Sequence, residues 1–508
     1  MPGKRIPDLT AITGADTASD DNLVIFDTSA NTTKRILPSE LPFVPAGTGA
    51  VTRTTQAKLR ESVSVKDFGA VGDGVTDDTA AIQAAINANP GRIILFSRGT
   101  YSVNEIIVSS DNTTIDLDGS SLTVRSNNIN CITFKPTTAG TTAAFLNGCS
   151  IKNGNILMVG FPNSTGAGIE LRQCNGFTME NIVFYDADLQ IYGGQLSRAI
   201  GCRHYASSGS KGTGSAMIHL REAPYGSGLY QPCYTFEFAD WVVGCGVLRD
   251  ACIRIHSGDG ITFHGGYAAR GANTQVLIMS SRNGSYVGPL RFNGSYLDAL
   301  SPTTGSPHSV EIRADGNSSS IVYSLFLDGC TLGNGTSVGL VCDKPETYVI
   351  SAVGCYIVNF ASWGVSIEEA GTTGDVLISG CQLQNNGDGV SGVVRLAGTG
   401  GESFNITGNI FTNSQNLCVS MDGTWGRGAI VGNVNNSAIA DIATTTAVFS
   451  NPLVISGNAS AYAFPGTAFS WVGEKMVLAN LADNAAAVSA GLRTGQLYQT
   501  SGAVKVVT

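Results

Sequence analysis

The sequence has few charged residues, and they are spread along the chain. Asp, Glu, Lys and Arg make up 14% of the 508 residues, with 39 acidic and 30 basic side chains and a net charge of −9. No cluster of Lys and Arg could neutralise a row of phosphates, so we expect no nucleic-acid partner. The chain also has no apolar run of the roughly 18 residues that a membrane-spanning helix needs, and residues 1–8 lack the apolar stretch of a secretory signal. We therefore expect that the protein does not insert into a membrane and that it is synthesised in a cytoplasm.

The cysteines are numerous but form no pattern of a ligand set. There are 12 of them, scattered through the chain without a CxxC pair. In a chain of this length this pattern favours free buried thiols over a disulfide framework or a zinc site. We expect no metal and no cofactor.

A repeated pattern is what the sequence does have. From about residue 145, two apolar residues at alternate positions precede a small or polar turn residue, and another apolar residue follows; residues 325–332 show this best. Spacings of roughly 21 to 38 residues are typical of coils with three short strands and three turns, which lengthen only in protruding loops. The pattern predicts an all-β solenoid, a parallel β-helix. Its predicted turn residues are Gly148, Asn181, Cys202, Asp240, Gly265, Gly294, Gly329, Gly354, Gly380, Gly408 and Gly432.

One position after the turn, thiol and amide side chains are expected to stack inside the coils. The thiols would act as small apolar fillers and the asparagines would hydrogen-bond along the stack. The spacing between coils leaves a disulfide between Cys330 and Cys355 open. The predicted ladder consists of Cys149, Cys330, Cys355, Cys381, Asn409 and Asn433.

The ends of the chain differ from the repeat. Residues 1–60 are interpreted as a small module with a linker, 61–145 as the entry to the β-helix, 146–472 as its coils and 473–508 as a terminal cap or association module. In the entry, Asp77 or Asp78 is a natural N-cap for an amphipathic helix that carries Ile82 and Ile86 and covers an open end of the fold. In the last module we expect a helix over 481–491 and a hairpin that turns at 501–502.

The entry also carries a family resemblance. Residues 67–86, DFGAVGDGVTDDTAAIQAAI, closely resemble the opening motif of the pectate-lyase-like β-helix superfamily, which includes polysaccharide lyases, glycoside hydrolases and bacteriophage tailspikes. Residues 92–101 resemble the strand and turn that follow in this family, with Ser97 where proline is usual. The resemblance implies a right-handed parallel β-helix and is silent about the reaction.

Both ends resemble phage tail proteins. Residues 1–42 are similar to N-terminal virion-attachment segments, and 491–507, GLRTGQLYQTSGAVKVV, are similar to short C-terminal ends of such proteins. The resemblance implies a homotrimer that attaches to virion tail proteins through its N-terminal segment.

Candidate catalytic residues follow from the predicted outward rows. Glycoside hydrolysis usually needs two carboxyl groups about 5 to 9.5 Å apart, which neighbouring coils can supply. The row one position before the turn contains Glu180, His264, Asn293 and Asp328, and the row three positions before it contains Glu237, Thr262 and Arg291. With Asp259 nearby, Glu237, Asp259 and His264 are the candidate catalytic residues. The alternative, that each is a solvated surface or turn residue, stays open. A calcium-dependent lyase would need a carboxylate cluster and a basic residue, and the sequence offers no convincing one. We therefore favour a hydrolase.

Binding residues are expected on the two longest coils. One carries Arg221, Glu222, Tyr225, Tyr230 and Tyr234, and the other carries Tyr296, Asp298, His308, Glu311 and Arg313. Long loops on a rigid rod often carry recognition, and aromatic rings stack on sugars. The candidate substrate-binding residues are Tyr230, Arg291, Tyr296 and Asp328, although the tyrosines could instead pack in a trimer interface.

Together these features predict a phage tailspike or tail-fibre protein in the virion tail that binds a host surface glycan. Whether it also cleaves the glycan is left open. One alternative is a structural adaptor that displays another receptor-binding protein. Another is a free secreted polysaccharide enzyme, which would need an export signal.

Overall fold

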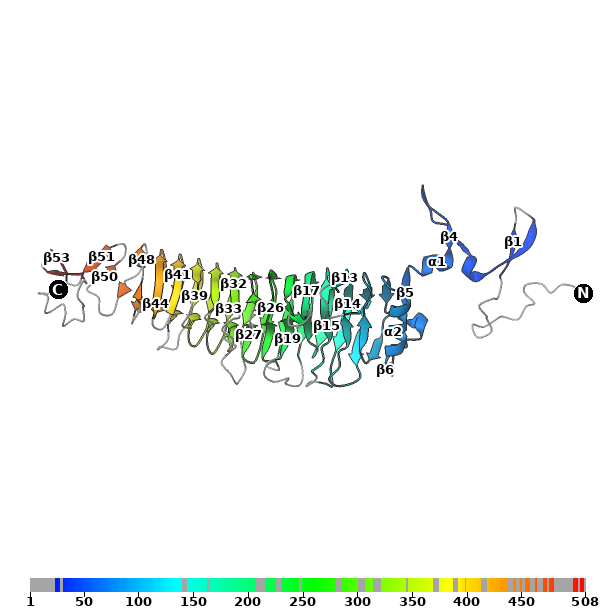
Figure 1. Cartoon of the computed structure of the whole chain (residues 1–508), viewed down its shortest axis with the longest axis horizontal. Helices are drawn as coiled ribbons and strands as arrows, with labels where there is room; N and C mark the ends of the chain where they lie inside the picture. Colours follow the sequence, from blue (N-terminus) through cyan, green and yellow to red (C-terminus); the bar gives the residue numbers. More distant parts are fainter. Residues whose placement is uncertain are drawn as a thin grey trace, which may run out of the picture.

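A computed structural model describes most of the chain. The described residues are 23–27, 31–138, 144–161, 165–206, 215–224, 230–245, 249–279, 286–299, 307–313, 321–343, 346–368, 374–386, 392–397, 399–412 and 418–435, followed by eight short strands between 442 and 506. Figure 1 shows that the strands stack along one long rod.

The rod is a parallel β-helix, as the repeat predicts, and it is right-handed, as the family resemblance implies. Each coil contributes a strand to each of three rows, and we call these rows faces A, B and C. Within a row, every strand pairs in parallel with the equivalent strands of the coils before and after it. Because residues alternate in direction along a strand, one set of side chains points inward and the other outward.

The bounds of the strands follow the chain through the faces. Face A contains β5 (Ser62–Ser64), β7 (Ile93–Leu95), β10 (Thr114–Asp116), β22 (Cys233–Ala239), β25 (Ile261–His264), β29 (Leu290–Asn293), β32 (Ile321–Asp328), β35 (Thr347–Val353), β38 (Asp375–Ser379), β41 (Thr399–Thr407), β44 (Thr424–Val431) and β48 (Leu453–Ser456). Face B contains β6 (Asp73–Asp77), β8 (Thr100–Val103), β11 (Ser121–Val124), β18 (Arg203–Tyr205), β23 (Val242–Gly244), β26 (Tyr267–Ala269), β30 (Tyr296–Asp298), β33 (Thr331–Gly333), β36 (Tyr356–Val358), β39 (Gln382–Gln384), β42 (Ile410–Thr412) and β45 (Val434–Asn435). Face C contains β9 (Ile106–Val108), β12 (Ile132–Phe134), β15 (Ile169–Asn175), β19 (Ala216–Arg221), β24 (Ala251–Ile255), β27 (Thr274–Ile278), β31 (His308–Ile312), β34 (Leu340–Cys342), β37 (Val365–Ile367), β40 (Val394–Leu396), β43 (Val419–Met421) and β46 (Ile442–Thr444).

Some strands continue around a corner or pair beside the rows. Strands β14 (Ser150–Leu157) and β16 (Thr178–Tyr185) run from face A to face B, and β17 (Leu189–Ile200) runs from face C to face A. Short additional strands are β13 (Leu146–Asn147), β20 (Ala223–Pro224), β21 (Tyr230–Gln231), β28 (Tyr286–Val287) and β47 (Val448–Phe449).

The inward side chains form one continuous hydrophobic core. Phe238, Phe263 and Phe292 stack from coil to coil with ring centroids 4.5 and 4.6 Å apart and planes within 5°. Burying each ring stabilises the fold by about 1.5–3 kcal/mol. Trp241 packs edge-on against Phe263 and fills the space at Gly266, where a Cβ atom would lie 2.5 Å from the indole.

The corner between faces A and B is a left-handed turn in coil after coil, which explains the repeated glycine. Its residues have φ between 51° and 66° and are Asn153, Asn181, Gly201, Asp240, Gly265, Gly294, Gly329, Gly354, Gly380, Gly408 and Gly432.

Two predicted turn residues are wrong. Cys202 lies one position after the true turn residue, Gly201. Gly148 belongs to the corner between faces C and A, in register with Gly176, and Asn153 takes its place in the predicted row. Gly148 was assigned to the wrong corner because the corner between faces C and A also uses left-handed residues here, with φ of 65° at Gly148 and Gly176. The local sequence pattern is therefore the same at the two corners.

The predicted internal ladder is confirmed from Cys330 onward. The backbone N–H of Cys355 contacts Sγ of Cys381 at 3.3 Å, that of Cys381 donates to Oδ1 of Asn409 at 2.8 Å, and that of Asn409 donates to Oδ1 of Asn433 at 2.9 Å. Cys149 is not part of this ladder, because it shares the corner of Gly148. All 12 cysteines are free and buried, so no disulfide joins Cys330 to Cys355.

The predicted helix closes the N-terminal end of the rod. Helix α2 (Thr79–Ala88) begins after Asp78 and buries Ile82 and Ile86 against the first coil (Figure 1). Asp78 is the N-cap residue, but its carboxylate accepts hydrogen bonds from the backbone of Val71 and Gly72.

Small elements precede the rod. They are β1 (Leu23–Asp27) paired antiparallel with β2 (Thr32–Ile36), the 3-10 turn η3 (Pro38–Glu40), β3 (Pro42–Phe43) paired with β4 (Arg53–Thr54), helix α1 (Thr55–Leu59) and the 3-10 turn η4 (Val65–Phe68).

Past β48 the described strands pair antiparallel. Strands β49 (Tyr462–Ala463), β50 (Phe469–Val472) and β51 (Lys475–Leu478) form one sheet across the predicted boundary at 472. Strands β52 (Leu497–Thr500) and β53 (Ala503–Val506) pair as the predicted hairpin requires. The helix predicted over 481–491 lies outside the described residues.

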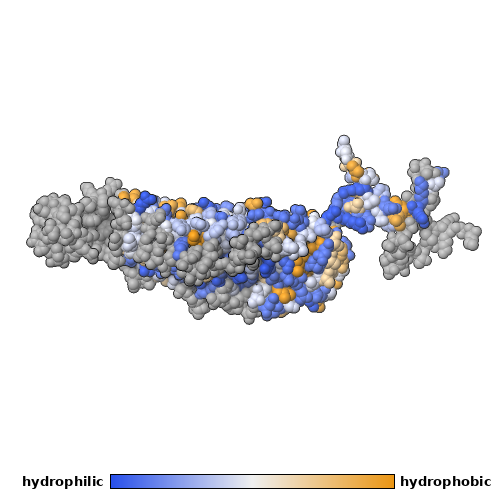
Figure 2. Space-filling view, viewed as in Figure 1, coloured by the Kyte–Doolittle hydropathy of each residue, from blue (hydrophilic) through white to orange (hydrophobic). Residues whose placement is uncertain are grey.

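The surface of the rod is polar over most of the side that Figure 2 shows, and hydrophobic residues gather near the end that α2 covers. No helix in the described part of the chain is long and apolar enough to cross a membrane.

Candidate functional site

Face A carries the two predicted outward rows. Glu237, Thr262 and Arg291 are consecutive partners on β22, β25 and β29. His264, Asn293 and Asp328 are consecutive partners on β25, β29 and β32. The periodicity of the sequence therefore placed these side chains in the correct register.

The pairs on face A are loose and solvated. Nε2 of His264 lies 3.8 Å from Oε1 of Glu237, and the two side chains are 47% and 50% exposed. Nη1 of Arg291 lies 3.9 Å from Oδ2 of Asp328, with similar exposure, and its guanidinium stacks on the ring of Phe326 at 4.2 Å. Exposed pairs of this kind stabilise a fold by only about 0.2–1 kcal/mol. The carboxylate of Glu237 thus has an imidazole, rather than a second carboxyl group, beside it.

Asp259 lies at the corner between faces C and A, away from the pair of Glu237 and His264. Strand β25 separates it from His264, and the three steps from Ile261 to His264 alone span about 10 Å. At this corner the backbone of Asp259 forms a β-bridge with the backbone of Tyr234. The hydroxyl of Tyr234 is 3.3 Å from that of Tyr286. Burial, with smaller contributions from Tyr234 and Asp259, raises the pKa of Tyr286.

The two predicted tyrosines lie on different elements. Tyr296 is on face B, next to Tyr267 at a centroid distance of 5.3 Å, and its hydroxyl accepts a hydrogen bond from Asn334. The backbone of Tyr230 forms β21, which pairs with β20 directly after β19 of face C. The side chain of Tyr230 lies outside the described residues, as does Tyr225.

Face C is the second polar face, and the side chains of Glu170, Arg254 and Glu311 on it are only 7%, 12% and 10% exposed. Two outward positions, separated by one inward residue, repeat from strand to strand. The first position is taken by Glu170, Gln190, His219, Arg254, Leu277 and Glu311, and the second by Arg172, Tyr192, Arg221, His256, Met279 and Arg313.

On the two outer strands of this set, each arginine is held by the glutamate of its own strand. Arg172 donates to Glu170 through Nε at 2.5 Å and Nη2 at 3.1 Å. Arg313 donates to Glu311 through Nε at 2.6 Å and Nη2 at 2.8 Å. The Glu311 side chain is 10% exposed. Two-pronged pairs of this kind are stronger than single hydrogen bonds.

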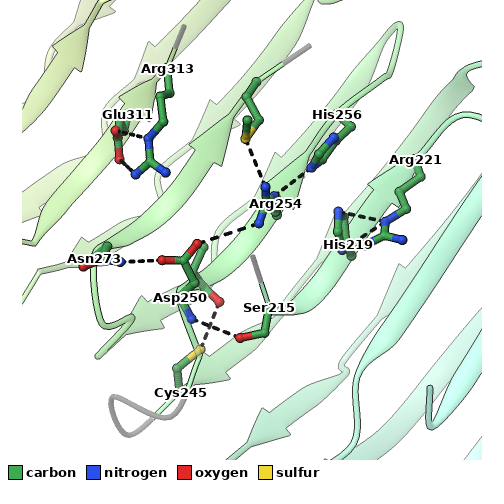
Figure 3. Close-up of polar contacts among 12 residues, drawn as sticks. Ser215, His219, Arg221, Cys245, Asp250, Arg254, His256, Asn273, Glu311 and Arg313 are labelled. Atoms are coloured by element: carbon green, nitrogen blue, oxygen red, sulfur yellow. Dashed lines mark hydrogen bonds and ion pairs between the residues drawn. The ribbon is translucent and has the colours of Figure 1, made fainter. Parts of the chain in front are cut away.

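Between them lies a block of alternating side chains, His219, Arg221, Arg254 and His256, which we call the His–Arg block. His219 and Arg254 are direct strand partners, and the rings of His219 and His256 are 4.9 Å apart. Nε of Arg221 lies 3.0 Å from Nε2 of His219, and Nε of Arg254 donates to Nε2 of His256 at 2.7 Å. Figure 3 shows the block, with the pair of Glu311 and Arg313 to one side of it.

Both histidines of the block are held in the neutral form. Burial, then the charges of Arg221 and Arg254 and the other imidazole, lowers the pKa of His219 well below 6.5. Burial, then Arg254 and Arg221, lowers the pKa of His256 to about 3. Neutral imidazoles can accept the hydrogen bonds of the guanidinium groups, which protonated rings could not.

A carboxylate contacts one edge of the block. Oδ2 of Asp250 lies 3.7 Å from Nη1 of Arg254, and its Oδ1 accepts a hydrogen bond from Asn273 at 2.5 Å (Figure 3). Tyr192 borders the other edge, where Arg172 and Arg221 stack on its ring at 4.7 and 5.6 Å. The block is therefore framed by an acid on one side and by an aromatic ring on the other.

This arrangement suits binding of polar ligands more than metal chemistry. Among the described residues, no three His, Cys, Asp or Glu side chains gather closely enough to hold a metal ion. A crevice of about 480 Å³ near Asp111 and Phe145 is separate from both faces' candidate residues.

The sequence analysis placed Arg221, Glu311 and Arg313 on the two long coils expected to carry binding residues, but it did not single out His219, Arg254 or His256. A signal for them exists in the sequence, because Glu-x-Arg at 170–172 and 311–313 has the same spacing as His-x-Arg at 219–221 and Arg-x-His at 254–256. Charged or aromatic residues two apart on a strand point to the same side.

Comparison with known proteins agrees with the fold. Residues 62–214 match the family model described as rhamnogalacturonase A/epimerase, pectate lyase-like. The described coils continue the same β-helix beyond this match, so the chain has the fold of pectate lyase-like β-helix proteins.

Relatives in sequence match over short stretches. Plasmin and fibronectin-binding protein A of Streptococcus pneumoniae is 35% identical over 115 residues, which cover 22% of this chain and 13% of that protein. The capsule K30/K69-specific depolymerase of Klebsiella phage K64-1 is 37% identical over 97 residues, which cover 17% of this chain and 12% of that protein. The matches thus span only a small part of either relative.

A solved structure matches over most of the rod. A mutant tailspike protein of E. coli bacteriophage HK620, in complex with a pentasaccharide, has a TM-score of 0.56 at 13% identity, covering 81% of this chain and 82% of that one. At this identity the likeness concerns the fold.

Proposed function

We propose that the protein is a bacteriophage tailspike or tail-fibre protein that recognises a bacterial surface polysaccharide. Face C carries this proposal, because it presents hydrogen-bonding groups and the ring of Tyr192 on rigid strands, half-buried and fixed by their neighbours. Ligand sites typically combine a few oriented polar groups with apolar or aromatic surface. Sugar hydroxyls would meet such groups on face C without reordering them.

Two relatives support the choice of ligand. One is a phage depolymerase specific for bacterial capsule, and the other is a tailspike solved with a pentasaccharide. In this proposal the protein is a homotrimer in the virion tail, and residues 1–60 attach it to other tail proteins.

Cleavage is the second part of the proposal. We assign catalysis to Glu237, Asp259 and His264, by hydrolysis rather than elimination. Their separation by β25 requires the glycan to cross from face C over the corner at Asp259 to face A. Sugar contacts are assigned to Tyr230 beside face C, to Arg291 and Asp328 on face A, and to Tyr296 on face B.

A second candidate is recognition without cleavage, as in an adhesin or a structural adaptor. It is favoured by the half-exposed Glu237, whose neighbour is the imidazole of His264 instead of a second carboxyl group. The sequence match to a surface protein that binds plasmin and fibronectin agrees with a binding role.

The test is to incubate the purified full-length protein with host capsular or outer polysaccharide. Reducing ends and the absorbance of unsaturated sugars report cleavage, light scattering reports the oligomer, and a pull-down reports binding. Matched variants are Glu237→Gln, Asp259→Asn and His264→Asn, with the exposed Arg427→Gln on β44 of face A, several coils away, as control.

New reducing ends that the three variants lose and Arg427→Gln retains support a hydrolase. Binding without cleavage supports the second candidate, as does stable association of the C-terminal end with another virion protein. Failure to bind host cells or their isolated glycan contradicts the proposal.

A further inference from the structure

The repeat on face C shows what partner an arginine at its second outward position takes. On the strands of Arg172 and Arg313, the first position supplies a glutamate that binds the guanidinium through both oxygens. On the strand of Arg221, the equivalent position is His219. At the centre of the face, a neutral imidazole ring therefore stands where the outer strands have a carboxylate.

Arg221 is left with neutral acceptors. Within the described part of the chain, its hydrogen-bond partners are the imidazole of His219 and the hydroxyl of Tyr192, which accepts from Nη1 at 3.1 Å. A guanidinium has five N–H donors in a planar fork that matches a carboxylate. The two partners of Arg221 leave part of this fork unused.

Arg254 is also weakly satisfied. Besides His256, its Nη2 contacts the thioether sulfur of Met279 at 3.2 Å. Its Nη1 is buried without a hydrogen bond to any described residue and lies 3.7 Å from the carboxylate of Asp250. Thioether sulfur is a weak acceptor, and 3.7 Å is beyond hydrogen-bond range.

We propose that the His–Arg block binds the carboxylate of an acidic sugar, such as a uronate unit, within the polysaccharide. This deepens the proposed function and rests on it. The block carries two guanidinium groups, and the carboxylate in contact with it is Asp250, which also holds Asn273. A ligand carboxylate would supply at Arg221 what Glu170 and Glu311 supply on their strands. The block is thus locally positive in a chain whose net charge is −9.

The experiment uses an array of purified bacterial surface polysaccharides and the full-length protein. Each uronate-containing polysaccharide is printed in native and in carboxyl-reduced form, beside neutral and phosphorylated ones. Variants are Arg221→Gln and His219→Glu, and Arg427→Gln on β44 is the control on face A. In His219→Glu the new side chain has the spacing of Glu170 and Glu311, so it should occupy Arg221 from within.

We expect native acidic polysaccharide to bind at least about tenfold more tightly than its reduced form, a difference of about 1.4 kcal/mol. Both face C variants should remove that difference, while Arg427→Gln keeps it. Melting temperatures identify a variant that fails to fold. If Arg221→Gln fails to fold, the result for His219→Glu decides the test.

Equal binding of native and reduced forms would overturn the inference and leave the proposed function standing. Binding restricted to neutral or phosphorylated polysaccharides would also overturn it, as would a carboxylate preference that both variants retain. Binding to no polysaccharide would overturn the proposed function itself.

Discussion

Faces A and C point charged side chains outward from the same kind of strand, yet they hold charge in opposite ways. Glu237 and His264 on face A are about half exposed and 3.8 Å apart. Glu311 and Arg313 on face C are 10% and 31% exposed and 2.6 Å apart. The alternation of a strand sets the direction of a side chain, whereas its neighbours along the face set its solvation. Preorganised binding sites should therefore be sought where outward charged side chains are also shielded from solvent by their neighbours.

The largest expected difference between the faces is in stability. Glu311→Ala removes the acceptor of a shielded guanidinium, and we expect it to lower the free energy of unfolding by about 2–3 kcal/mol. Glu237→Ala should change it by less than about 1 kcal/mol, because water already solvates that pair. Urea unfolding at one protein concentration measures both. The double variant Glu311→Ala with Arg313→Ala should recover part of the loss, and equal losses on the two faces would refute the contrast.

A pH titration should produce the next largest effect. The pKa of His256 falls from 6.5 unfolded to about 3 folded, so the unfolded chain binds the proton first as the pH drops. The stability of the neutral ring is complete above pH 6.5 and is lost between 6.5 and 3, by up to about 1.4 kcal/mol per pH unit. His219, with its pKa shifted in the same direction, adds to the loss. His256→Asn should flatten unfolding free energy against pH in this window; an unchanged slope would contradict the shielding of face C.

The smallest effect is expected for Arg291 on face A. Arg291→Gln loses both a 3.9 Å ion pair with Asp328 and the stacking on Phe326, and should cost less than about 1 kcal/mol. Asp328→Asn, which keeps the stacking, should cost less still. Thermal unfolding of the two variants separates these contributions, and a larger effect from Asp328→Asn would mean that the ion pair matters more than its geometry indicates.

Much of the fold could be predicted because each coil repeats its own constraints. The left-handed corner demands glycine or asparagine so regularly that Gly265 to Gly432 fixed the register of both outward rows of face A. The stack of Cys355, Cys381 and Asn409 followed from the same register.

The remainder depends on packing that periodicity does not contain. Gly148 was assigned to the wrong corner because left-handed residues occur at more than one corner of a coil, and Gly201 was missed by one position in favour of Cys202. The His–Arg block was missed because glycine does not recur in every coil at either corner of face C, and the connections of its strands vary in length. Neither the exposure of Glu237 nor the shielding of His219 can be read from alternation.

The buried thiols give the rod a built-in chemical probe. Cysteines occur from Cys131 to Cys418, and each is enclosed in the coil that carries it. Burial raises the pKa of Cys131 to about 12 and that of Cys149 to about 11, so these sulfurs are poor nucleophiles until their coil opens. Alkylation followed by peptide mapping would therefore record the order in which the coils separate under force or denaturant, without any introduced label.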